Sequence, residues 1–169
     1  DGLVRQYSIE DNKFDTQFDN INVGCLSCHG DMSDHSNHKT TTVNPNTAKL
    51  ISQKTGLWLR NENDKTAHWQ GEQRDNSFMD NCFSCHALRE PLIDGFKANI
   101  PFLEQFTPHL LSTPNYYPDG QIKEEVYVYG SFLQSKMFEA RVNCLDCHDK
   151  HTMKLKIEGN GVCLQCHSP

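Results

Sequence analysis

Cys144-Leu145-Asp146-Cys147-His148 is one of four Cys-x-x-Cys-His segments in this chain of 169 residues. The others lie at 25–29, 82–86 and 163–167, and in chain order the four are called motifs 1 to 4. Together they use every cysteine of the chain: Cys25, Cys28, Cys82, Cys85, Cys144, Cys147, Cys163 and Cys166. Each motif ends in a histidine, and these are His29, His86, His148 and His167.

The motif spacing indicates haem attachment. Two thiols on one turn of chain can form thioethers with the two vinyl groups of a haem, and the histidine that follows is then placed to ligate the iron. A zinc ribbon is the competing interpretation, because Cys147 and Cys163 enclose a fitting spacer, but a four-thiolate zinc site has no use for the histidines. Thioredoxin-like redox pairs would need strands that alternate with helices around the motif, a pattern that the sequence lacks, and structural disulfides do not require the histidines. The sequence therefore predicts four covalently attached c-type haems with iron.

Composition agrees with this prediction, since 36% of the residues are hydrophobic and the mean hydropathy is −0.68. A core of side chains alone would be thin, whereas haems would add apolar volume and cross-link the chain. We expect one domain over 1–169, mostly α with much irregular chain, in which the haems form the core and folding depends on their attachment. The motif spacing suggests two lobes, 1–76 with motif 1 and 77–169 with motifs 2 to 4.

The charge balance narrows the range of partners. With 16 basic and 22 acidic residues the net charge is −6, and haem propionates would make it more negative. Nucleic acid and anionic membranes are disfavoured, and redox partner proteins are expected to dock through a complementary basic patch. No apolar run reaches the roughly 18 residues of a membrane span. Because c-type haem is attached outside the cytoplasmic membrane, we expect an exported, periplasmic or extracellular protein whose signal peptide has been removed.

Five histidines outside the motifs are candidates for the sixth ligand of each iron: His35, His38, His68, His109 and His151. Their number nearly matches four bis-histidine haems. On one helical turn His148 and His151 would project from the same side, so His151 is expected to serve another haem. His35 and His38 are expected to serve different irons, or only one of them is used. For His109, a surface histidine at a helix start is the competing interpretation.

Methionine is the other common sixth ligand, and the candidates are Met32, Met79, Met137 and Met153. Met137 and Met153 lie in apolar patterns and are expected to be core residues. Met32 and Met79 lie close to motifs and stay open as ligands.

Local patterns predict short elements around the motifs. Each motif is expected on a helical turn, with short helices continuing through 87–90 and up to 161–166. Hydrophobic periodicity favours an amphipathic helix over 131–141. The alternation at 126–129 is compatible with a short strand. Composition alone predicts a polar loop over 36–77, although its two tryptophans, Trp58 and Trp69, indicate something apolar to cover.

Two stretches resemble known multihaem cytochromes. Gly24-Cys25-Leu-Ser-Cys28-His29-Gly30-Asp31-Met32-Ser33-Asp34-His35 resembles a segment of exported cytochromes related to the tetrahaem electron acceptor of hydroxylamine oxidoreductase. The region from Asn81 to His167 resembles multihaem cytochromes that often carry tetratricopeptide repeats. This similarity rests on Cys82-Phe-Ser-Cys85-His86-Ala-Leu-Arg89, Tyr117-Pro-Asp-Gly-Gln121, Tyr129-Gly-Ser-Phe-Leu-Gln-Ser-Lys-Met137, Cys147-His148-Asp-Lys-His151 and Gly159-Asn160-Gly-Val-Cys163.

This resemblance implies c-type haem, bis-histidine ligation with His35 and His151 in distal roles, closely packed haem pairs and electron transfer. The sequence departs from the second group because no repeats follow before Pro169. We expect either a small stand-alone member or a piece of a longer protein. The similarity leaves 36–77, with His68, without a counterpart.

The leading hypothesis is an electron carrier whose irons are six-coordinate and bind no substrate. It includes a variant, the subunit of an extracellular cytochrome polymer, in which a surplus histidine ligates iron in a neighbouring copy. The alternative is a small multihaem reductase or oxidase of nitrogen or sulfur oxyanions with one open iron. Such an enzyme would need proton donors near that iron, for which Tyr116, Tyr117 and Arg141 are candidates that do not group around one motif.

Overall fold

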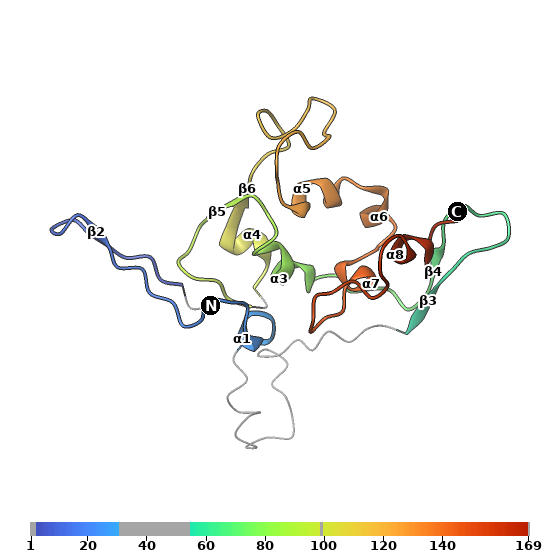
Figure 1. Ribbon diagram of the computed structural model, residues 1–169, viewed down its shortest axis with the longest axis horizontal. Coiled ribbons are helices and arrows are strands. Elements are labelled where there is room, and N and C mark those ends of the chain that lie inside the picture. Colours follow the sequence, from blue (N-terminus) through green and yellow to red (C-terminus); the bar gives the residue numbers. More distant parts are fainter. Residues whose placement is uncertain (1–2, 31–54, 99, 169) are drawn as a thin grey trace, which may run out of the picture. The chain divides into compact units, whose positions relative to one another are not determined.

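The computed structural model describes residues 3–30, 55–98 and 100–168, which form short elements joined by irregular chain (Figure 1). The helices are α1 (Cys25–His29), α3 (Met79–Phe83), α4 (Phe102–Gln105), α5 (Val128–Leu133), α6 (Lys136–Glu139), α7 (Cys144–Cys147) and α8 (Gly161–Leu164). Isolated helices shorter than about 12 residues are marginal in water. These one-turn helices therefore depend on contacts outside themselves.

Three antiparallel two-stranded sheets accompany the helices. They pair β1 (Tyr7–Ser8) with β2 (Lys13–Phe14), β3 (Gly56–Leu59) with β4 (His68–Gly71), and β5 (Arg89–Pro91) with β6 (Phe106–Pro108). In the β3–β4 hairpin Trp58 lies opposite Trp69, and the ring centroids are 5.6 Å apart. A two-stranded hairpin is marginal alone, so this aromatic pair is a main source of its order.

Contacts divide the chain into two units, each assembled from two stretches of sequence. Unit 1 is Asp1–Ile51 with Asp80–Gly130, and unit 2 is Ser52–Met79 with Ser131–Pro169. Motifs 1 and 2 fall in unit 1, and motifs 3 and 4 fall in unit 2. This division differs from the lobes 1–76 and 77–169 expected from motif spacing, because the stretch with the β3–β4 hairpin joins the C-terminal motifs.

The core of unit 1 is aromatic. The ring of Phe102, which is only 1% exposed, stacks on Phe106 at 5.5 Å and lies 4.8 Å from Tyr129. Phe83, inside motif 2, meets Tyr129 edge to face at 4.8 Å. Gln105 is fully buried, but its amide donates to the carbonyl oxygens of Lys97 and Ile100 and accepts from the Lys97 amide, so burial leaves its polar atoms satisfied.

Four local expectations differ from the structure. The polar stretch contains the β3–β4 hairpin, because its tryptophans pack on each other and on distant residues. The predicted helix over 131–141 is interrupted before α6, where the Ser135 hydroxyl accepts the Phe138 amide as a cap. The stretch 87–90 leads into strand β5 instead of a helix, because 89–91 pairs with 106–108. The alternative strand at 126–129 does not form, since α5 begins at Val128.

Few apolar side chains are covered among the described residues. Eight hydrophobic residues are buried: Ala67, Met79, Phe83, Ala87, Phe102, Phe106, Tyr116 and Leu145. By comparison, 25 large hydrophobic residues are exposed. Met137 and Met153 are among the exposed, at 47% and 52%, so their expected place in the core was wrong. The protein by itself leaves much apolar surface for something else to cover.

Candidate haem-attachment sites

The motifs share one backbone geometry. In motifs 2, 3 and 4 the histidine amide donates to the carbonyl of the first cysteine at 2.9 Å, and motif 1 forms helix α1. This bond closes one helical turn, which brings residues three and four positions apart to the same face. The two thiols of a motif and its histidine therefore share a face, and the expectation that each motif sits on a helical turn is confirmed.

None of the eight cysteines forms a disulfide, and none is buried. Cys25, Cys85 and Cys163 are exposed, and the other five are partly exposed. Reaction with a haem vinyl group requires an accessible thiol, so the arrangement suits attachment. The described residues contain no group of three or more His, Cys, Asp or Glu side chains that could hold one metal ion. Cys144, Cys147, Cys163 and Cys166 are all described, and they do not form the cluster of a zinc ribbon.

Within unit 1, motifs 1 and 2 lie together. Asn81, just before motif 2, donates its side-chain amide to the Cys28 carbonyl at 3.2 Å. The pKa of the Cys28 thiol is raised, first by burial and then by the nearby Cys85 and Cys25. Thiols from two motifs are therefore close enough to interact.

Unit 2 joins motifs 3 and 4 in a similar way. Gln165, inside motif 4, donates to the backbone carbonyl of Asp146 in motif 3 at 3.1 Å. Burial raises the pKa of Cys147, and Asp146 and then Cys163 raise it further. Each unit therefore brings two motifs together through an amide side chain.

His148 has the hydrogen bond expected of an iron ligand. Its Nδ1 donates to the carbonyl of Met153 at 2.8 Å, since a carbonyl can only accept. Histidines that ligate metals commonly donate one ring nitrogen to a carbonyl, which fixes the ring and leaves the other nitrogen for the metal. Met153 has φ +56°, a left-handed conformation that a side chain disfavours. The fold accepts this strain at the residue whose carbonyl orients His148.

Asp149 builds the loop that carries this carbonyl. Its Oδ1 accepts the amides of His151 and Thr152 at 3.1 and 2.8 Å and the Thr152 hydroxyl at 3.0 Å. Hydrogen bonds from Thr152 are the main reason that the pKa of Asp149 is lowered. His148 and His151 thus lie on a tight loop. The premise that they share a helical turn was wrong, because α7 ends at Cys147.

Apolar side chains around the motifs also fit a haem. Leu26 in motif 1 and Leu164 in motif 4 are 54% and 50% exposed. Leu155 and Ile157, on the chain between motifs 3 and 4, are 46% and 44% exposed. A planar apolar group attached at the adjacent cysteines would remove such surfaces from water. Accessible paired thiols, a bonded motif histidine and uncovered apolar residues together fit c-type haem.

The spare histidines of unit 2 lie near its motifs. His68 is the first residue of β4. Just before it, the Ala67 amide donates to the Cys166 carbonyl at 2.7 Å, and Thr66 forms an isolated β-bridge with His167. The His68 Nε2 lies 3.8 Å from Asp64, which is too long for a hydrogen bond. His151 is exposed on the loop after motif 3. Unit 2 therefore holds two motifs and two other histidines.

The remaining candidate ligands and proton donors lie in different parts of the chain. His109 in unit 1 has its Nε2 3.3 Å from a Glu90 carboxylate oxygen, across the β5–β6 hairpin. His35, His38 and Met32 lie outside the described residues. Met79 is 3% exposed. Of the candidate proton donors, Tyr116 and Tyr117 belong to unit 1 and Arg141 to unit 2.

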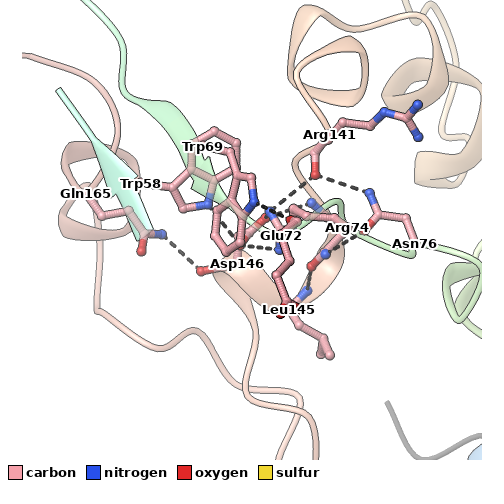
Figure 2. Close-up of polar contacts among 10 residues, drawn as sticks. Trp58, Trp69, Glu72, Arg74, Asn76, Arg141, Leu145, Asp146 and Gln165 are labelled. Carbon is pink, nitrogen blue, oxygen red and sulfur yellow. Dashed lines mark hydrogen bonds and ion pairs between the residues drawn. The ribbon is translucent and has the colours of Figure 1, made fainter. Parts of the chain in front are cut away.

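Sequence reasoning missed a polar cluster in unit 2 (Figure 2). Arg74 donates from both terminal guanidinium nitrogens to the Asp146 carboxylate, at 2.8 and 2.9 Å. The two side chains are 10% and 11% exposed. Trp58 donates its indole N–H to Asp146 at 3.1 Å, and the guanidinium lies 4.3 Å from the Trp69 ring centroid. One signal was available, because motif 3 alone has an acidic residue between its cysteines. Nothing in the sequence singles out Arg74.

Comparison with protein-family models, curated proteins and solved structures gave no significant match to this chain. Among the described residues, no helix combines the length and the apolar character needed to span a membrane.

Proposed function

We propose that this protein is a tetrahaem c-type cytochrome that carries electrons between redox partners outside the cytoplasmic membrane. The observation that carries the proposal is the shared geometry of the motifs, in which no cysteine forms a disulfide and none is buried. The eight motif cysteines would hold the haems, and His29, His86, His148 and His167 would be the proximal ligands. Bound haem iron supplies one-electron chemistry by changing between the ferric and ferrous states.

In unit 2 the proposal assigns the distal positions to His68 and His151. The unit has two motifs and two other histidines, and the His68 Nε2 lies 3.8 Å from Asp64, which is too long for a hydrogen bond. His109 is the weakest distal candidate, because its Nε2 is engaged by Glu90. His35 and His38 then stand as the candidates for motifs 1 and 2. The resemblance to multihaem cytochromes supports His35 and His151 in these roles.

The role of the chain's own residues is to bind and position. The helical turn presents both thiols on one face, and the Met153 carbonyl fixes the His148 ring. Six-coordinate irons leave no position for substrate, which favours a carrier over an enzyme. The acidic excess of the sequence lies in unit 1, whereas acidic and basic residues nearly balance in unit 2. A redox partner with a basic surface would therefore be attracted mainly to unit 1.

Low-temperature electron paramagnetic resonance of the oxidised protein tests the proposal, together with its mass and visible spectrum. The mass should show four haems per chain. Only low-spin signals, unchanged by cyanide or nitrite, are expected from four six-coordinate haems. A high-spin signal that shifts on ligand addition would replace the carrier with the oxyanion reductase or oxidase. A chain without haem after expression in a host competent for c-type attachment would refute both.

A further inference from the structure

The Arg74–Asp146 ion pair is largely buried, with side chains that are 10% and 11% exposed. It forms two hydrogen bonds, at 2.8 and 2.9 Å, and Arg74 also donates to the Arg141 carbonyl at 3.2 Å. Figure 2 shows the tryptophans of the β3–β4 hairpin packed beside it. Water screens such a pair far less than it screens charges on the surface.

The pair is attached to the backbone of two motifs. The Asp146 carboxylate accepts the Asn143 amide at 2.8 Å, which caps α7, while the Asn143 side chain accepts from Leu145. The Asp146 carbonyl accepts the amide of Gln165 in motif 4. One acidic residue thus fixes the start of motif 3 and its contact with motif 4.

The two charges do not lie symmetrically about these motifs. Asp146 immediately precedes Cys147, whereas Arg74 approaches from the chain that follows β4. The negative end of the pair therefore belongs to motif 3 itself, whereas the positive end comes from outside the motifs.

We propose that Arg74 and Asp146 act as a positioning pair that sets the redox potential of the haem sites in unit 2, with Asp146 favouring the oxidised iron and Arg74 limiting that effect. This inference rests on the proposed function. Reduction adds one electron to a haem site and lowers its charge by one. A nearby carboxylate opposes that change, and a nearby guanidinium favours it. Burial gives both effects a long reach.

The test compares midpoint potentials of the four-haem protein with those of Asp146→Asn, Arg74→Gln and the double variant. Asp146→Asn leaves the guanidinium uncompensated and is expected to raise the reduced-to-oxidised ratio of the affected haem about tenfold at fixed ambient potential, about 59 mV for one electron. Arg74→Gln is expected to shift the same part of the titration in the opposite direction. The double variant should return close to the original curve.

Two controls separate charge from structure. Arg74→Lys keeps the positive charge but loses the planar fork, so its potential should stay near the original while its stability falls. Arg5→Gln breaks the exposed pair with Asp94, whose side chains are 49% and 60% exposed, and should shift nothing measurable.

Shifts in the same direction for both single variants, or no shift, would overturn the inference and leave the pair a purely structural role. If Arg74→Gln does not fold, Asp146→Asn decides alone, since it keeps the shape of the side chain and must raise the potential. Haem content by mass is measured on every variant. Four haems without opposite shifts refute this inference only, whereas an original protein without haem refutes the proposed function.

Discussion

Both units use an arginine beside a motif, but in different surroundings. In unit 1 the Nε of Arg89 donates to the Ser84 carbonyl at 2.5 Å, and its guanidinium lies 3.8 Å from the Phe106 ring centroid. In unit 2 Arg74 binds the Asp146 side chain and lies over Trp69. Ser84 and Asp146 each precede the second cysteine of a motif. Each arginine therefore bonds the residue before the second cysteine of a motif and lies over an aromatic ring.

The difference lies in what surrounds that contact. In unit 1 the arginine contact lies on an aromatic core centred on Phe102, whereas in unit 2 it is an ion pair held by hydrogen bonds. An apolar core is non-directional and contributes through buried area. A buried ion pair contributes little beyond its desolvation cost but demands a specific geometry. We infer that unit 1 gains more of its stability from packing, and unit 2 more of its precise arrangement from polar contacts.

Removing single histidines is expected to give the largest difference between the two units. His151→Ala or His68→Ala should each convert one low-spin haem to a high-spin haem that binds cyanide, because unit 2 has no further histidine to replace the ligand. His109→Ala in unit 1 should convert none, since Glu90 engages its Nε2. Electron paramagnetic resonance before and after cyanide measures the outcome. A new high-spin signal in His109→Ala, with none in His68→Ala, would reverse the assignment.

The aromatic core of unit 1 gives the next largest effect. Phe102→Ala is expected to lower the free energy of unfolding by about 4 kcal/mol, because it removes a ring that is 1% exposed and leaves a cavity. Leu103→Ala, the neighbouring residue at 61% exposure, is the matched control and should cost less than about 1 kcal/mol. Denaturant unfolding of the holoprotein compares them. Equal losses would mean that Phe102 is not in a packed core.

Breaking the ion pair of unit 2 should cost slightly less. Arg74→Ala is expected to lower the free energy of unfolding by about 3 kcal/mol, because it leaves the Asp146 carboxylate buried without its partner. Arg5→Ala removes a surface partner and should cost less than about 1 kcal/mol. The Arg74 loss should also change little between low and high salt in denaturant titrations. A loss that disappears in salt would indicate an exposed pair.

How much of this could be predicted depends on the distance along the chain between interacting residues. The turn of each motif was predictable because the bond from the histidine amide to the first cysteine carbonyl joins residues four apart. The β3–β4 hairpin was missed because its anchor is remote, as Trp58 reaches Asp146 across 88 residues. The tryptophans signalled apolar contact without naming the partner. For the same reason, the sequence did not reveal which motifs share a unit.

The smallest effect concerns the loop that orients His148. Met153→Gly is expected to raise the free energy of unfolding by up to about 1 kcal/mol, because glycine adopts the left-handed backbone at φ +56° without a side-chain penalty. This gain is partly offset by the greater freedom of glycine in the unfolded chain. The bond from His148 to the backbone carbonyl can remain, so the low-spin signals should not change. Met137→Gly, in helix α6 without a left-handed backbone, is the control and should be destabilising by about 1 kcal/mol. If Met153→Gly were the more damaging, the Met153 side chain rather than its carbonyl would be the group that this loop supplies.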